Sequence, residues 1–136
     1  MQYIILYFST ALIFLGCDAV MLKHVMRPLF VRSLGDQLAE DFRLGPAAVF
    51  YLFYIAGILI LASLPALREG SAWPALWKGA LIGAMAYGTY EFTSYAVMAR
   101  WSPHMVYVDV AWGIFVTGLS AWGGVMITRA LLGLFN

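Results

Sequence analysis

Side chains able to do chemistry are concentrated between Tyr90 and Gly113, in the segment YEFTSYAVMARWSPHMVYVDVAWG. This segment holds two acids, Glu91 and Asp109, together with one arginine, one histidine, three tyrosines and two tryptophans. Carboxyl groups inside a membrane can hold a polar head group or exchange protons, and aromatic rings can enclose an apolar body. The chemistry indicated is therefore the binding, or the proton chemistry, of a small amphiphilic molecule.

The composition assigns these residues to a membrane protein. The chain has 136 residues, of which 63% are hydrophobic and 11% charged, whereas about a quarter of the residues in a soluble domain are charged. Eight Lys and Arg residues against seven acids provide no basic surface, so we expect no nucleic acid partner. The single cysteine, Cys17, excludes an intramolecular disulfide.

The predicted fold class is an all-α integral membrane protein with four transmembrane helices in one domain, residues 1–136. A span needs about 20 apolar residues, and four segments meet this requirement, at about residues 3–22, 46–64, 76–98 and 105–134. The second span has no charge and is expected to stop before Pro65. Apolar residues at mostly four-residue steps predict an interfacial amphipathic helix at about residues 28–43.

Small residues follow one another along the third and fourth predicted spans. They are Gly79, Ala80, Gly83, Ala84 and Gly88 in the third, and Gly113, Thr117, Gly118, Ser120, Gly123 and Gly124 in the fourth. Such residues let two helices approach closely where lipid supplies no hydrophobic drive for association. We expect them to pack helices together, and these faces would also allow a homodimer.

Loop charges indicate an orientation. Lys and Arg are more numerous in the loops after the first and third spans than on the other side. By the positive-inside rule this bias favours cytoplasmic loops at those positions. We expect a multi-pass membrane protein with both termini outside the cytoplasm.

Three acids inside the spans fall at one depth, because successive spans run in opposite directions. Asp18 lies near the end of the first span, Glu91 about two turns before the end of the third, and Asp109 about one turn after the start of the fourth. A charge in hydrocarbon costs about 2.5 to 3.5 kcal/mol on insertion scales, so these acids should face the bundle interior or a wet cavity.

The sequence therefore predicts an acidic pocket with aromatic walls, open toward the cytoplasmic leaflet. The predicted ligand-binding residues are Asp18, Glu91, Asp109, Tyr87, Tyr95, Tyr107, Trp112 and Arg100. The three acids could form an all-carboxylate metal site, but they lack the Glu-x-x-His or His-x-x-x-His spacing that marks such sites, so we expect no metal. No cofactor motif or phosphate-binding loop is found, so no cofactor is expected.

These residues are compatible with three functions. The first is the binding of an amphiphile such as a membrane lipid or a quinone-like molecule. The second is an enzyme, or a membrane subunit of one, in lipid modification, with the paired acids acting as acid and base. The third is a structural accessory subunit, in which the acids form ion pairs and tyrosine hydrogen bonds that set helix register.

The same segment resembles an uncharacterised family of small bacterial predicted membrane proteins, known as a domain of unknown function. The matching positions are Tyr90, Glu91, Thr93, Tyr95, Ala96, Trp101, Asp109, Trp112 and Gly113, with Asp18 a looser match. The resemblance implies a location in the bacterial inner membrane, where the predicted outer termini would be periplasmic, and a four-helix architecture over most of the chain. It implies no activity, substrate or cofactor.

Overall fold

The computed structural model describes residues 2–35 and 44–135, which are helical over almost their whole length. Consecutive helical elements that join without a break are called rods here, and the described residues form four of them. The first rod comprises α1 (Gln2–Met21), the π-helical segment η1 (Leu22–Met26) and α2 (Arg27–Leu34). The second comprises α3 (Leu44–Ile58), the π-helical segment η3 (Leu59–Ser63) and α4 (Leu64–Glu69). The other two are α5 (Trp73–Val97) and α6 (Pro103–Phe135). The all-helical fold predicted from the sequence is confirmed.

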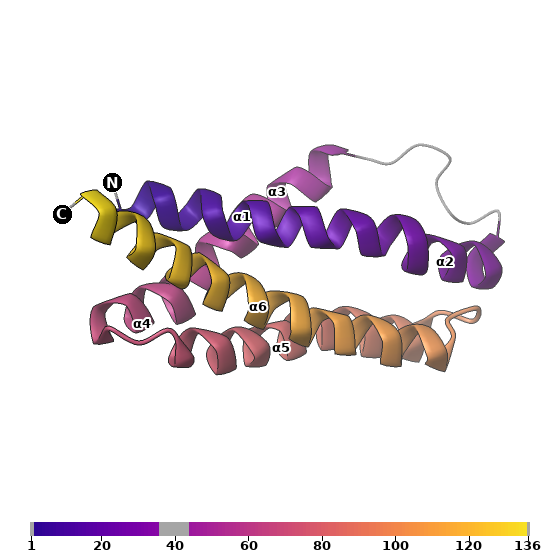
Figure 1. Cartoon of the computed structure of the whole chain (residues 1–136). Helices are drawn as coiled ribbons and strands as arrows, with labels where there is room; N and C mark the ends of the chain where they lie inside the picture. The colour runs from indigo at the N-terminus through magenta and orange to yellow at the C-terminus, as the bar shows by residue number, and fades with distance from the viewer. Residues whose placement is uncertain (1, 36–43, 136) are drawn as a thin grey trace.

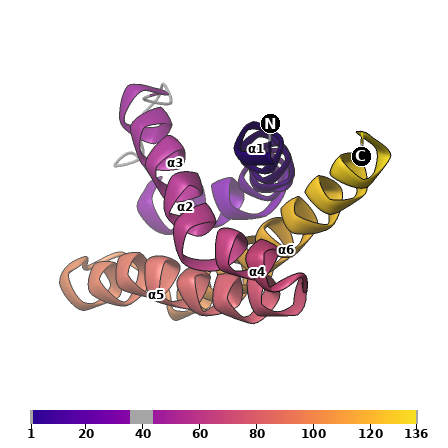
Figure 2. The same ribbon diagram turned by 90° about the vertical axis from the view of Figure 1, so that its left-hand side faces the viewer.

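Successive rods run in opposite directions, as the sequence predicted for successive spans. The two chain ends and the turn between α4 and α5 lie at one end of the molecule, and the end of α2 lies with the α5–α6 corner at the other (Figure 1). Viewed almost along its own axis, α1 lies between α3 and the C-terminal part of α6 (Figure 2), and its most extensive contacts are with α6. Helix α6 packs along both α1 and α5.

Three helical stretches among the described residues are long and apolar enough to cross a membrane. They are Gln2–Arg32, Gly45–Glu69 and Pro103–Gly133. Helix α5 has 25 residues, which is sufficient length, but Lys78, Glu91 and its many small and hydroxyl residues make it less apolar. The fourth span therefore stays a prediction.

Two prolines lie inside continuous helices, which corrects two predicted helix ends. A proline has no N–H to donate to the carbonyl four residues earlier, and a π-helical segment precedes both Pro28 and Pro65. The first helix therefore does not end near residue 22 but continues to Leu34. A separate surface helix starting near residue 28 is not found, and residues 36–43 of that predicted helix lie outside the described residues.

The second rod likewise passes the position where the sequence was expected to stop it. It continues through Pro65 to Glu69 instead of ending before the proline. Gly70 then ends the helix with a φ of 76° in the left-handed region, where its backbone N–H caps the carbonyls of Ala66 and Leu67. Glycine adopts this conformation without the steric cost that a side chain would bring.

Helices α5 and α6 approach through their glycines, as predicted. A Cβ atom added to Gly83 would lie 2.1 Å from the carbonyl oxygen of Gly113, and one added to Gly79 would lie 2.9 Å from that of Thr117. A Cβ on Gly124 would lie 2.1 Å from Oγ1 of Thr10 in α1. These three contacts lie within one chain, and the homodimer stays a prediction.

Two apolar clusters fill the described interior. One is centred on Phe14, Ile55, Ile58 and Val116, and the other lies around Trp101 near the corner, with Met26, Leu29, Met105 and Val106. Along the first rod, Asp18 falls between Phe14 and Met26, and along α6, Asp109 falls between Val106 and Val116. The acids thus lie in a polar layer between two apolar ones.

Candidate functional site

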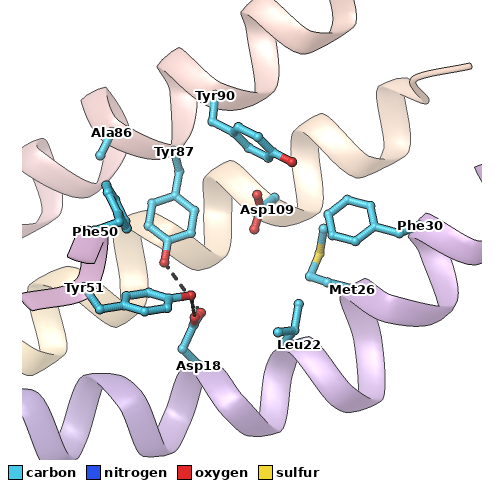
Figure 3. Close-up of a pocket in the computed structure, with 10 residues that line it drawn as sticks. All are labelled: Asp18, Leu22, Met26, Phe30, Phe50, Tyr51, Ala86, Tyr87, Tyr90 and Asp109. Atoms are coloured by element: carbon cyan, nitrogen blue, oxygen red, sulfur yellow. Dashed lines mark hydrogen bonds between the residues drawn. The ribbon is translucent and has the colours of Figure 1, made fainter. Parts of the chain in front are cut away.

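A half-enclosed cavity of about 380 Å³ lies in this polar layer. Its lining comes from all four rods: Asp18, Leu22, Met26, Phe30, Phe50, Tyr51, Ala86, Tyr87, Tyr90 and Asp109. Figure 3 shows Asp18 beside Tyr51 and Tyr87 on one side of the cavity, and Asp109 near Tyr90 on the other. Most of the lining is apolar or aromatic, and the carboxyl groups of Asp18 and Asp109 are its acidic groups.

Asp18 accepts hydrogen bonds from three different helices. The Tyr51 hydroxyl of α3 donates to Oδ2 at 2.8 Å, and the indole Nε1 of Trp112 in α6 donates to Oδ1 at 3.0 Å. The Tyr87 hydroxyl of α5 donates a longer bond to Oδ1 at 3.5 Å. A carboxylate with three donors is well compensated for leaving water, and these bonds join α1 to the other three rods.

Glu91 is less well satisfied than Asp18. Its side chain is 0% exposed, and the indole Nε1 of Trp101 donates to its Oε2 at 3.0 Å. Its other oxygen, Oε1, is buried and has no hydrogen-bond partner among the described residues. The Glu91 carboxyl group lies against that of Asp109, which is 8% exposed and lines the cavity. The Glu91–Asp109 pair therefore places two carboxyl groups at the cavity wall, and one oxygen of Glu91 receives no hydrogen bond from the described residues.

The corner between α5 and α6 positions this pair. Trp101 is 8% exposed and lies against the rings of Phe30 in α2 and Tyr90 in α5, with centroid distances of 5.8 Å and 5.6 Å. Its indole N–H is thereby held toward Glu91. The corner therefore places the Trp101 indole, which lies outside both helices, against Glu91, two to three helical turns earlier in the chain.

The structure brings together some of the predicted site residues and separates others. Asp18, Tyr87 and Asp109 line the cavity, while Glu91 and Trp112 support it from behind through Asp109 and Asp18. Tyr95 and Tyr107 are 47% and 75% exposed and do not line it. Arg100 is also exposed at the corner and outside the lining. Tyr95 was placed by helical spacing and Arg100 by its depth, and neither reveals which face of a helix meets its neighbours.

Several lining residues were missed from the sequence. They are Tyr51, Tyr90, Phe50, Met26, Phe30, Leu22 and Ala86. Tyr51 carried a usable signal, because it and Tyr54 place hydroxyl groups in an otherwise uncharged span, where a buried hydroxyl needs a partner. Met26 and Phe30 carried no such signal, because that part of the chain was expected to lie on the membrane surface.

Metal binding has no support in the described part of the chain. Within residues 2–35 and 44–135, no group of three or more His, Cys, Asp or Glu side chains is arranged to hold a metal ion. What the arrangement can do is hold an apolar body against aromatic and aliphatic side chains, and a polar group against two neighbouring acids.

An all-helical membrane protein with an acidic, aromatic cavity between its helices is the class that these observations define. The chain belongs to the family described as predicted membrane protein (DUF2177), a family of unknown function whose model matches residues 3–126. This confirms the resemblance drawn from the residues between Tyr90 and Gly113. No curated protein and no solved structure matches the chain.

Proposed function

We propose that the protein binds a small amphiphile, such as a lipid or a quinone-like molecule, in the cavity of the polar layer. The observation that carries this proposal is the cavity itself, about 380 Å³ with a mainly apolar and aromatic lining and acids on its wall. Ligand sites have volumes of about 300 to 1,000 Å³ and combine such linings with a few polar groups.

The acids would have different roles in this function. Asp18 already accepts three hydrogen bonds, so its role would be to hold the helices in register. Asp109 and Glu91 have fewer donors and would receive the polar head of the ligand. Among the described residues, no serine, threonine, cysteine or histidine lines the cavity, and we therefore rank amphiphile binding above an activity in lipid modification.

Native mass spectrometry of the detergent-extracted protein tests the proposal. We expect a retained small-molecule mass on the unaltered chain, lost on Ala86→Trp, because Ala86 lines the cavity and an indole would fill part of it. Asp109→Asn should reduce occupancy. Glu69→Gln, an exposed acid at the far end of α4, is the matched control and should retain the ligand. A retained mass that is unchanged in Ala86→Trp would contradict binding in this cavity.

The proposed location is the bacterial inner membrane, with the α5–α6 corner cytoplasmic and the termini periplasmic. Arg68 near the end of α4 and His104 near the start of α6 are both exposed. The α4–α5 turn and the α5–α6 corner lie at opposite ends of the molecule (Figure 1), so single cysteines at the two positions report orientation in a Cys17→Ala background. We expect a membrane-impermeant maleimide to label Arg68→Cys in spheroplasts and His104→Cys after lysis alone. The reverse pattern would contradict this orientation, and equal labelling of both in sealed cells would contradict a spanning arrangement.

A further inference from the structure

We infer that the polar head of the bound amphiphile is a protonated amine, held by the Glu91–Asp109 pair. This inference rests on the proposed function, because it names the chemical class of the ligand in the same cavity. It depends on three observations: an acid oxygen without a donor, the signs of the charges around the cavity, and the arrangement of apolar and aromatic side chains near the pair.

The unpartnered oxygen indicates that a donor is missing. Glu91 is completely buried, and its Oε1 has no hydrogen-bond partner among the described residues, although Trp101 satisfies its Oε2. A buried acceptor without a partner is unfavourable, and such groups in native structures call for an explanation. Asp18, in the same layer, accepts three hydrogen bonds. Between these two acids, the missing donor therefore concerns Glu91 and not Asp18, and Asp109, the neighbour of Glu91, lines the cavity.

The charges at the cavity select the sign of the head group. Among the described residues that line it, two are acids and none is Lys, Arg or His. Two carboxyl groups in contact repel each other when both are ionised, so the pair favours a positively charged group that donates hydrogen bonds. A phosphate or carboxylate head would add a further negative charge. An ammonium group brings one positive charge and three N–H donors and no acceptor, which matches what the pair lacks.

The neighbouring side chains fit the rest of such a molecule. The Tyr90 ring lies beside Asp109 on one wall (Figure 3), where an aromatic face can attract a cation. The wall contributed by the first rod is apolar and consists of Leu22, Met26 and Phe30 (Figure 3). An alkyl chain or ring system would lie against these side chains while the amine contacts Asp109.

Three probes with the same alkyl chain and different heads test the inference on the full chain in a non-ionic detergent. Dodecylamine, dodecanol and dodecanoate are added separately at neutral pH, and adducts are counted by native mass spectrometry. A hydrogen bond to a charged group contributes enough for about a tenfold or greater preference. We expect dodecylamine to bind at least about tenfold more tightly than dodecanol, and dodecanoate more weakly than either. Asp109→Asn should lower the affinity for dodecylamine to that for dodecanol, whereas Glu69→Gln should not.

The outcomes separate this inference from the proposed function. Equal binding of the three probes, all lost in Ala86→Trp, would overturn the amine assignment and leave amphiphile binding intact. A dodecylamine preference that survives Asp109→Asn would overturn the assignment to the acid pair. Binding of none of the probes, together with no retained native ligand, would overturn both. If Asp109→Asn does not fold, the ranking of the probes on the unaltered chain and on Ala86→Trp still decides the head-group class.

Discussion

Gly83→Ala is expected to lower the free energy of unfolding by about 3 kcal/mol, and Gly83→Val to prevent folding. The added Cβ atom would lie 2.1 Å from the carbonyl oxygen of Gly113 and 2.7 Å from its carbonyl carbon. Both are backbone atoms of a packed helix, so relief requires α5 and α6 to move apart. Overpacking typically costs about 1 to 3 kcal/mol, and a clash with backbone belongs at the upper end because no side chain can turn away.

Unfolding in mixed micelles, followed by circular dichroism, measures this effect. Gly88→Ala is the matched control on the same helix, since a Cβ there would meet the Phe92 ring alone, at 3.9 Å. We expect Gly88→Ala to be neutral or slightly stabilising, because alanine is favoured over glycine in a helix by about 0.8 to 1.0 kcal/mol. Equal stabilities of the two variants would show that α5 and α6 do not approach through Gly83.

Asp18→Ala is expected to lower the free energy of unfolding by about 2 to 4 kcal/mol. The substitution leaves Tyr51, Tyr87 and Trp112 without their shared acceptor. Hydrogen bonds between membrane helices average about 0.6 kcal/mol each, whereas unsatisfied buried donors in soluble proteins cost about 1 to 3 kcal/mol each. Three hydrogen bonds at the membrane-helix average contribute about 2 kcal/mol to the free energy of unfolding. The charge on the Asp18 carboxylate raises that contribution.

Single-donor variants show whether this loss comes from the network. Tyr51→Phe removes one bond to Asp18 and should cost about 0.6 kcal/mol or somewhat more. Glu69→Ala removes an exposed acid at the end of α4 and should leave the unfolding midpoint unchanged. If Asp18→Ala were as stable as Glu69→Ala, the three hydrogen bonds would not hold the helices together, and Asp18 would be free to serve a ligand instead.

The hairpin between α5 and α6 was the part of the fold most accurately predicted from the sequence. Spans at about 76–98 and 105–134 correspond to helices at Trp73–Val97 and Pro103–Phe135. Charged and proline residues at the corner interrupt two apolar runs, and such interruptions are local signals. The glycines of both helices were expected to pack, and Gly83 does so against Gly113, because glycine is the residue that permits such an approach in a membrane.

The two proline-containing helices show where local signals fail. One helix was expected to end near residue 22 and another before Pro65, yet a π-helical segment precedes each of Pro28 and Pro65 and both rods continue. Whether a proline ends a helix or is accommodated depends on the packing of the residues beyond it. Beyond Pro28, Leu29 is buried and Phe30 lies against Trp101 of the corner, a contact between residues far apart in the chain.

The sequence by itself determined the class of protein, the positions of the acids and the convergence of Asp18, Glu91 and Asp109 on one layer, because composition, span length and alternating direction are properties of the chain. The tertiary structure alone decided how those acids differ. It directs three donors from three helices to Asp18 and leaves one Glu91 oxygen without a donor behind Asp109. It also adds Tyr51 and Phe30 to the cavity and leaves Tyr95 and Tyr107 outside it. The physical reason is that helix rotation and crossing, set by glycine contacts and buried rings, determine which side chains meet, and neither is encoded in the spacing along one helix.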